Sequence, residues 1–427
     1  MYRILGFSTL FISFPLAIAL AADDAAKAKP QARGEVKLTE EGLKVHRAGL
    51  LIDGHNDLPW MFREKKDPSF LVIDINKPQP ALNTDIPRLR KGGVGAQFWS
   101  AFVPASFGKK GIAVRETLEQ IDIIHRMVRA YPDTFEMAST ADDIVRIHAK
   151  GKIASMVGVE GGHSIDNSLA VLRMLYPLGV RYMTLTHSET LDWADSATDK
   201  PKSHGLSKFG EQVVREMNKL GMLVDISHVS AETMRHAIRV SRAPVIASHS
   251  SAFAVANHPR NVPDDVLKMI KERDGVVMVN FFSGFVVPEA ARLSQDMFQV
   301  MRELQAKYPN ENDFSNAMRQ YGKEHPLPAG TVHDVVDHIE HIIQIAGVEH
   351  VGLGSDFDGV TQLPVQLKDV SCYPYITQEL LNRGHSAEEI HKVMGANVLR
   401  VMRKAEQVAR QMNAPGASVS GGSVGTR

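Results

Sequence analysis

Eight short apolar runs recur along the chain, and they constrain its fold more than any other feature. Each run has the length of a buried strand, and longer stretches with helical periodicity, such as "FGEQVVREMNKLG" and "VHDVVDHIEHIIQIAG", lie between them. The runs are, in order, "GLLIDGH", "GVGAQFWS", "IASMVGVE", "VRYMTLTH", "GMLVDISH", "APVIASH", "GVVMVNFF" and "HVGLGSD". Strands that alternate with helices are typical of a parallel sheet. The eight units therefore predict a (β/α)8 barrel of the TIM type.

Most of these runs finish in a side chain that can bind a metal ion. The six residues concerned are His55, Glu160, His187, His228, His249 and Asp356. A single histidine at a strand end is more often a hydrogen-bonded residue than a ligand. A closed barrel, however, gathers all its strand ends into one bowl, where unpaired charges are costly and a metal ion would satisfy them. Asp57 follows His55 at the spacing that points both side chains to one side of a strand, so both can reach one ion.

Other histidines lie outside this pattern. His333, His338 and His341 fall in a helical stretch with no carboxylate at strand-end spacing, and we expect them to form a solvated helix face. His163 follows Glu160 within "VEGGHSI". Its expected role is structural, with support of a metal ligand as the alternative.

The charge balance limits the partners that the chain can attract. Lys plus Arg and Asp plus Glu both number 49, so the formal net charge is zero. This removes the electrostatic basis for general binding to nucleic acid or to an anionic membrane. With 44% hydrophobic residues among 427, the chain can bury a large core. A small neutral or zwitterionic partner is therefore expected, and no nucleic acid.

The start of the chain is typical of an export signal. Within residues 1–21, Arg3 precedes the apolar run "ILGFSTLFISFPLAIAL", which leads into a small-x-small pattern of the kind that signal peptidases cleave. We expect a cleaved signal and a periplasmic or secreted protein, with an uncleaved anchor as the alternative. Cys372 is the single cysteine, so no intramolecular disulfide is expected after export.

One long domain is predicted between two polar segments. Residues 22–36 form an Ala/Lys/Pro linker, residues 37–410 the barrel domain, and residues 411–427 a Gly/Ser tail. Neither the linker nor the tail is expected to be ordered. No other run is long and apolar enough to span a bilayer, so a stable membrane anchor is not expected.

Several motifs together resemble one enzyme family. They are "DGHNDLP", "VEGGHSI", "YMTLTHS", "LVDISHVS", "VIASHSSA" followed by "NHPRNVPD", and "GLGSDFDGV". This set is similar, in order and approximate spacing from about residue 40 to about residue 405, to the membrane or renal dipeptidases. These are zinc-dependent M19 peptidases of the amidohydrolase superfamily. The resemblance implies a zinc metallopeptidase that hydrolyses the peptide bond of free dipeptides, and it suggests a homodimer.

The resemblance also implies a binuclear centre with two zinc ions per chain. His55 and Asp57 would bind one zinc, His228 and His249 would bind the other, and Glu160 would bridge the two. A hydroxide shared between the metals would be the nucleophile, because zinc lowers the pKa of bound water to about 7.

Three further residues receive roles from the same resemblance. Asp356 would act as the acid/base that moves protons, His187 would steady the tetrahedral oxyanion, and Arg260 would receive the terminal carboxylate of the substrate. Charge counting supports this scheme, because two Zn²⁺ against two carboxylates and one hydroxide leave a net positive site for an oxyanion.

Three features depart from the family pattern. The disulfides and the C-terminal lipid-anchor signal of the animal members have no counterpart, so membrane attachment does not transfer. The usual "NFY" reads Asn280-Phe281-Phe282, which removes one hydroxyl near the substrate pocket. The segment from about Val287 to Gly330 is long beside the family pattern, and we expect it to form a lid or an extension of the rim.

Two other functions are compatible with parts of the pattern. One is another binuclear amidohydrolase, acting on a lactam or another cyclic amide, but such enzymes commonly bridge their metals with a modified lysine where Glu160 stands. The other is a metal-binding protein without activity. It predicts a lost acid/base group or carboxylate clamp, whereas Asp356 and Arg260 are both present.

Overall fold

A ring of parallel strands forms the core of the barrel domain in the computed structural model, which describes residues 33–65, 69–70 and 72–415. The strands of the ring are β1 (Leu51–Asn56), β2 (Val94–Phe102), β4 (Ile153–Glu160), β5 (Val180–Thr184), β6 (Leu223–Asp225), β7 (Ile246–Ala247), β8 (Val276–Val279) and β9 (Val351–Leu353). Each pairs in parallel with its neighbours, and the β2–β4 pairing closes the ring. The predicted eight-stranded barrel is confirmed, and each apolar run contains one strand.

A short ninth strand was not predicted. β3 (Phe135–Met137) pairs in parallel with the first residues of β4, outside the ring of eight. Three residues are too few to show a periodic pattern, and the segment gains its strand geometry from the partner.

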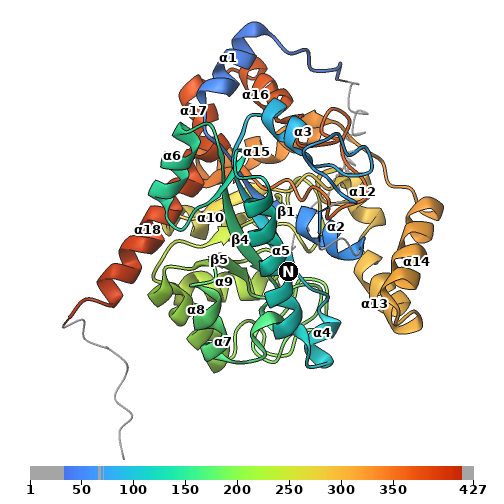
Figure 1. Cartoon of the computed structure of the whole chain (residues 1–427), viewed down its shortest axis with the longest axis vertical. Helices are drawn as coiled ribbons and strands as arrows, with labels where there is room; N and C mark the ends of the chain where they lie inside the picture. Colours follow the sequence, from blue (N-terminus) through green and yellow to red (C-terminus); the bar gives the residue numbers. More distant parts are fainter. Residues whose placement is uncertain (1–32, 66–68, 71, 416–427) are drawn as a thin grey trace, which may run out of the picture. The chain divides into compact units, whose positions relative to one another are not determined.

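Helices surround the strands (Figure 1). The first half of the chain supplies α1 (Glu40–Ala48), α2 (Leu58–Glu64), α3 (Ile86–Lys91), α4 (Ser106–Lys109), α5 (Ala113–Ala130), α6 (Ala141–Ala149), η1 (Gly162–Ile165), α7 (Leu169–Leu175) and α8 (Lys208–Leu220). The second half supplies α9 (Ala231–Val240), α10 (Asp264–Glu272), α11 (Ser283–Val286), α12 (Pro288–Leu293), α13 (Met297–Lys307), α14 (Glu311–Glu324), α15 (Val332–Ala346), η2 (Val348–His350), α16 (Tyr373–Asn382), α17 (Ala387–His391), η3 (Lys392–Ala396) and α18 (Asn397–Met412). Not one of these described helices has both the length and the apolar character that crossing a membrane requires.

Local sequence signals explain where the predicted helices begin and end. α8 begins after Ser207, whose side chain accepts a hydrogen bond from the Gly210 amide, and it ends at Gly221 in the left-handed conformation that glycine adopts without strain. α15 begins with a capping box between Thr331 and Asp334.

The alternation of side chains along the strands separates two apolar layers. Phe98 and Met156 belong to the same buried cluster as Tyr182, whereas their neighbours Trp99 and Val157 belong to the larger cluster under the helices. Tyr182 on β5 reaches His55 on β1 with a hydrogen bond of 2.8 Å, although β2 and β4 lie between these strands. Tyr182 and His55 therefore point into the interior of the barrel.

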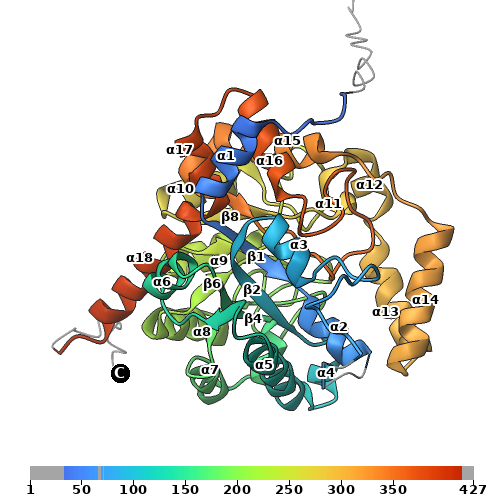
Figure 2. The same ribbon diagram turned by 45° about the horizontal axis from the view of Figure 1, so that its top comes forward.

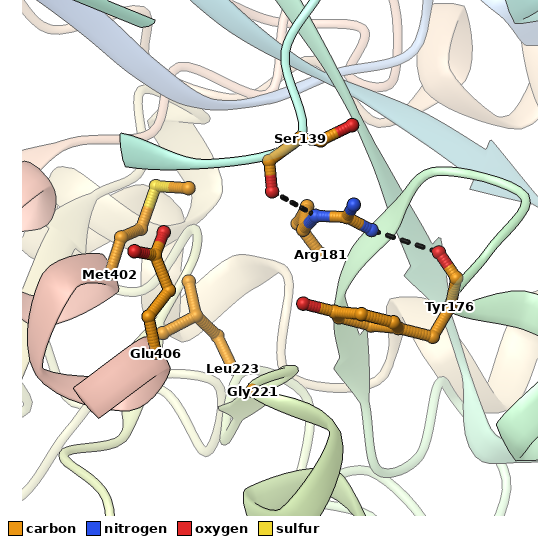
Figure 3. Close-up of a pocket in the computed structure, with 7 residues that line it drawn as sticks. All are labelled: Ser139, Tyr176, Arg181, Gly221, Leu223, Met402 and Glu406. Carbon is orange, nitrogen blue, oxygen red and sulfur yellow. Dashed lines mark hydrogen bonds between the residues drawn. The ribbon is translucent and has the colours of Figure 1, made fainter. Parts of the chain in front are cut away.

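The strand starts form the opposite end of the barrel, which holds a small pocket between α18 and the starts of β5 and β6 (Figure 3). At its centre, Arg181 donates to the carbonyl oxygens of Ser139 (2.6 Å) and Tyr176 (2.9 Å) and lies over the Tyr176 ring. Glu406 of α18 accepts a hydrogen bond from the Ala141 amide at 2.8 Å. These contacts fasten α18 and the β3–α6 connection to the barrel floor.

The long segment after β8 is helical. It contains α12, α13 and α14, and the last two lie side by side in both views (Figures 1 and 2). Arg302 of α13 donates to the carbonyl oxygens of Ser188 and Thr198, in the loop that follows β5. The segment thus extends the rim at the C-terminal ends of the strands.

Buried and helical residues extend slightly beyond residues 37–410 at both ends. Val36, which we assigned to the linker, is buried and its amide donates to the Gln366 side chain at 2.9 Å. α18 continues to Met412, two residues into the predicted tail. The predicted export signal over residues 1–21, and most of the linker and tail, lie outside the described residues.

The prediction that the histidines of α15 form a solvated face is wrong. His338 is fully buried; it accepts a hydrogen bond from the Ala252 amide and donates one to the Val286 carbonyl oxygen. His333 is also buried and pairs with Glu379, while His341 is half-buried and pairs with Asp264. α15 packs against strands on one side and against α10 and α16 on others, so few of its positions reach solvent.

Candidate active site

Seven of the predicted residues converge at the C-terminal end of the barrel. Their side chains form three overlapping groups of three residues. Within each group, one nitrogen or carboxylate oxygen atom per residue lies within 4.8 Å of the others. The members are His55, Asp57, Glu160, His187, His228, His249 and Asp356. All of them are buried except His187, which is half-buried. The structure therefore brings together side chains that are more than 300 positions apart in the sequence.

The site residues do not all finish strands, as the sequence pattern suggested. His55 lies within β1 and Glu160 is the last residue of β4. The other residues lie just past strand ends, in the loops after β5, β6, β7 and β9, or, for Asp57, at the N-cap of α2. His228 and Asp356 have φ angles of 64° and 65°. This left-handed conformation is uncommon for residues other than glycine and turns both side chains towards the centre.

Glu160 lies between two sets of ligand atoms. Its Oε2 is 3.5 Å from Nε2 of His55, and it also accepts a hydrogen bond from Ser100. Its Oε1 is 3.0 Å from Nε2 of His228 and 3.5 Å from Nε2 of His249. One oxygen thus faces the His55 side of the cluster and the other faces the remaining histidines.

Hydrogen bonds fix which nitrogen of His55 faces the centre. The Tyr182 hydroxyl donates to the Gly54 carbonyl oxygen at 3.2 Å, so it accepts from Nδ1–H of His55 at 2.8 Å. The lone pair of Nε2 then points at Oδ2 of Asp57, 3.2 Å away. Gly158 makes room for this arrangement, because a Cβ there would overlap the Tyr182 ring.

This convergence of lone pairs creates a strong preference for a cation. Burial alone would lower the pKa of His55, but Tyr182 and the carboxylates of Asp57 and Glu160 outweigh it and hold the pKa well above its usual range. The negative potential at Nε2 that attracts a proton would equally attract a metal ion. Nε2 has no hydrogen-bond partner of its own within the described part of the chain.

A second pair of hydrogen bonds, through Ser248, orients His249 in the same way. The Ser248 hydroxyl donates to Oδ2 of Asp225 at 2.6 Å, so it accepts from Nδ1–H of His249 at 2.7 Å. This again leaves the lone pair of Nε2 for the centre, where it lies 2.9 Å from Nε2 of His228. Burial lowers the pKa of both His228 and His249 well below its usual range, so both rings are neutral. Neutral imidazole nitrogens beside carboxylates are the ligands that zinc prefers.

Asp356 has the surroundings of a proton carrier. Asn280 donates to its Oδ2 at 2.7 Å. Burial, with repulsion from Asp57 and Glu160, raises the pKa of Asp356 well above its usual range despite the opposing effect of His55. Gly359 lets the chain pass this point, because a Cβ there would collide with the carboxylates of both Asp57 and Asp356.

Arg260 is a buried cation with unused hydrogen-bonding capacity. It is 1% exposed, and burial lowers its pKa to about 10, so it remains charged at neutral pH. It donates to the Ser250 hydroxyl and to the His249 carbonyl oxygen, both at 3.3 Å, while its Nε has no partner among the described residues. A guanidinium held beside the cluster in this way is ready to bind an anion.

Several residues that support the site were missed from the sequence. They are Tyr182, Asp225, Ser248, Asn280 as the partner of Asp356, and Gly359. A carboxylate inside an apolar run, as in "LVDISH", was the one available signal, because a buried Asp225 must have partners. His163 donates to the Val103 carbonyl oxygen, which fits its structural interpretation.

The barrel and the buried histidine–carboxylate cluster at its C-terminal end define a class of metal-dependent barrel hydrolases. Residues 39–416 match the model of the membrane dipeptidases, peptidase family M19, and the chain belongs to this family. It is therefore a metallopeptidase that acts on dipeptides. This sets aside the two alternatives, a cyclic-amide hydrolase and a metal-binding protein without activity.

Individual relatives agree with this assignment. The chain is 42% identical over 371 residues to the dipeptidase aclJ of Aspergillus oryzae, which covers 85% of this chain and 79% of that protein. Two solved structures, each 24% identical, share the fold. The probable dipeptidase PvdM from Pseudomonas aeruginosa has a TM-score of 0.73 and covers 86% of this chain and 98% of its own. A metallo peptidase from Rhodobacter sphaeroides, liganded with a phosphinate mimic of L-Ala-D-Ala, has a TM-score of 0.68 and covers 83% and 99%.

Proposed function

We propose that the chain is a two-zinc dipeptidase in which Glu160 bridges the metals. His55 and Asp57 would hold one zinc, and His228 and His249 the other. The observation that carries this proposal is the position of Glu160, whose two oxygens face the two sets of ligand atoms. The hydrogen bonds from Nδ1–H of His55 to Tyr182 and from Nδ1–H of His249 to Ser248 turn Nε2 of each ring towards the centre, which supports the same ligand set.

Zinc, when bound, would supply Lewis acidity and would activate a water molecule for attack on the peptide carbonyl. Asp356 would then handle the protons. Because Asn280 donates to Oδ2, one oxygen of the carboxyl group is held and the other stays free to exchange a proton. Asp356 would take a proton from the attacking water and return it to the leaving amine.

His187 would stabilise the oxyanion that develops on the carbonyl. Burial lowers its pKa to about 4, so its ring is neutral at neutral pH. The Ser188 hydroxyl lies 3.2 Å from Nδ1, and when it donates there, the proton of the ring sits on Nε2. Nε2 faces the centre, 3.7 Å from Oε1 of Glu160, so that N–H group can donate to the oxyanion.

Arg260 would bind the C-terminal carboxylate of the substrate and thereby select its length. The guanidinium is next to His249 through the backbone carbonyl oxygen of that residue. With the scissile carbonyl at the centre and the carboxylate on Arg260, one residue fits between them. The free amino group would meet the acidic side of the site, near Asp57 or Asp356.

A substrate screen combined with a metal assay tests this proposal. We expect about two zinc ions per chain and cleavage of free dipeptides, with little action on tripeptides and on N-acetylated or C-amidated dipeptides. Glu160→Gln should weaken both metals, whereas His249→Ala should weaken mainly one. A stoichiometry of one or less in metal-replete protein would contradict the two-zinc centre. Efficient hydrolysis of a C-amidated dipeptide would contradict the role of Arg260.

A further inference from the structure

An apolar cluster borders the proposed centre on the side of the long segment after β8. Its buried members are Phe282, Phe285 and Phe298, and the half-buried side chains packed against them are Met297, Met301, Leu327 and Val360. We call this set the phenylalanine wall. It is contributed by the loop that follows β8, by α11, by α13 and by the loops that follow α14 and β9.

The phenylalanine wall touches both ends of the space in which we place the substrate. The rings of Phe298 and His228 form a T-shaped pair, with 6.5 Å between centroids and an interplanar angle of 88°. The guanidinium of Arg260 lies over the Phe285 ring, 5.2 Å from its centroid. Phe285 and Phe298 are nearly parallel to each other at 6.5 Å. The two rings therefore span the distance from a proposed zinc ligand to the proposed carboxylate clamp.

The wall is held in a fixed position relative to the catalytic loops. Arg302 of α13 donates to the carbonyl oxygens of Ser188 (3.2 Å) and Thr198 (2.9 Å), in the loop that carries His187. Gln305 of the same helix donates to the Ser106 hydroxyl of α4 at 2.9 Å. These three hydrogen bonds fasten α13 (Figure 2) to the loop after β5 and to α4, so this helix holds Phe298 next to His228 and Met301 next to the phenylalanine rings.

We infer that the phenylalanine wall receives the side chain of the second residue of the dipeptide and gives the enzyme a preference for an apolar residue there. This inference rests on the proposed function, because the second residue is the one that lies between the scissile carbonyl and Arg260. An apolar side chain would gain by contact with Met301 and Val360, and methionine adapts to different shapes. A charged side chain would lose hydration against the wall, and the nearby Arg260 would already be occupied by the terminal carboxylate.

The test compares second residues in the zinc-loaded, full-length protein. The values of kcat/KM for Ala-Leu, Ala-Asp and Ala-Lys are each divided by that for Ala-Gly, which has no side chain to contact the wall. We expect Ala-Leu to exceed Ala-Asp and Ala-Lys by on the order of 10–200-fold, the range for discrimination by an apolar pocket. Leu-Gly against Ala-Gly measures the same preference at the first residue.

Substitution of Met301 tests the wall directly. Met301→Glu should lower the ratio of Ala-Leu to Ala-Gly by about tenfold and raise that of Ala-Lys. Met301→Gln, which is polar and uncharged, should lower the first ratio alone, and it serves if the glutamate variant does not fold. The matched control is Met174→Glu on α7, where the side chain is 64% exposed, and it should leave every ratio as in the wild type.

The outcomes separate the inference from the proposed function. If no free dipeptide is cleaved by the zinc-loaded protein, the proposed function fails and the inference fails with it. If dipeptides are cleaved with equal kcat/KM whatever the second residue, or if the preference appears only at the first residue, the proposed function stands and the inference is overturned.

Discussion

Two buried arginines, one at each end of the barrel, differ in how well their side-chain donors are hydrogen-bonded. Arg181 at the floor donates to three carbonyl oxygens, at distances of 2.6 to 2.9 Å, and lies 4.2 Å from the centroid of the Tyr176 ring (Figure 3). The side chain of Arg260 at the mouth also lies over an aromatic ring, but it makes only two hydrogen bonds, both of 3.3 Å, within the described residues, and its Nε is unpartnered. Burial lowers the pKa of both side chains.

This contrast between Arg181 and Arg260 shows at which end of the barrel polar groups remain able to bind a ligand. At the floor both Nε and Nη1 of Arg181 donate to nearby carbonyl oxygens, so the side chain stabilises the fold. At the mouth, several groups keep the capacity to bind a ligand. Arg260 has a donor with no partner in the described part of the chain, His55 and His249 direct Nε2 to the centre, and the carboxylates are crowded together. Barrels generally divide their ends in this way, with stability at the N-terminal face and chemistry at the C-terminal face.

The largest effect is expected for Asp356, the proposed proton carrier at the mouth. Asp356→Asn should lower turnover by about 10²–10⁴-fold, because an amide cannot take up and return a proton. Metal content, measured by elemental analysis, should stay close to that of the wild type. If activity stays within tenfold of the wild type, Asp356 is not the acid/base group. Asp358, whose pKa burial raises to about 6, would then be the next candidate.

The second prediction compares the two arginines directly. Arg260→Ala should raise KM and cost roughly 2–5 kcal/mol of transition-state binding, the range for removing one partner of a buried charge pair. Its free energy of unfolding should change little, because few interactions are lost. Steady-state kinetics with free dipeptides and urea denaturation measure the two quantities.

Arg181→Ala is the matched variant at the floor and should show the reverse. It removes the hydrogen bonds that the side chain donates to the carbonyl oxygens of Ser139, Tyr176 and Val180, which should lower the free energy of unfolding by about 1–3 kcal/mol. The kcat/KM of the folded fraction should remain that of the wild type. Loss of activity without loss of stability in this variant would contradict the division between the two ends.

The smallest expected effect concerns the orientation of a ligand. Tyr182→Phe removes the acceptor for Nδ1–H of His55 and leaves the ring volume in place. Zinc affinity at the His55 site should fall by about 10–100-fold, the usual range when the hydrogen-bond partner of a metal ligand is removed. Competition with a chelator measures it. A variant with unchanged affinity would mean that packing alone holds His55 in place.

The barrel and the composition of the site could be predicted because they depend on local patterns. Each apolar run has to be buried, and each run that ends in a polar side chain brings that group to the mouth. The roles of Arg260 and Glu160 were implied by resemblance to the family and not by the pattern. The structure places His55 in one group with Glu160 and His249 and in another with Asp57 and Asp356, and the roles of these residues stay predictions.

Features that depend on distant partners could not be predicted. The tautomer of His55 is set by Tyr182, which lies 127 positions away and resembles an ordinary core residue in the sequence. The burial of His338 follows from the elements packed on α15, not from the sequence of that helix. The left-handed backbone of His228 and Asp356 is imposed by the fold, since neither residue type requires it.

The position of Glu160 at the end of β4 has a consequence for how the centre would behave over time. β4 is paired with β2 from Ala154 to Glu160, and Glu160 itself lies opposite Phe102 on one side and Thr184 on the other. Opening this ladder requires sub-global unfolding, whereas the turns that carry His228 and Asp356 can open by local fluctuation. Among the side chains at the centre, Glu160 would thus keep its position while the loops that carry His228 and Asp356 move around it.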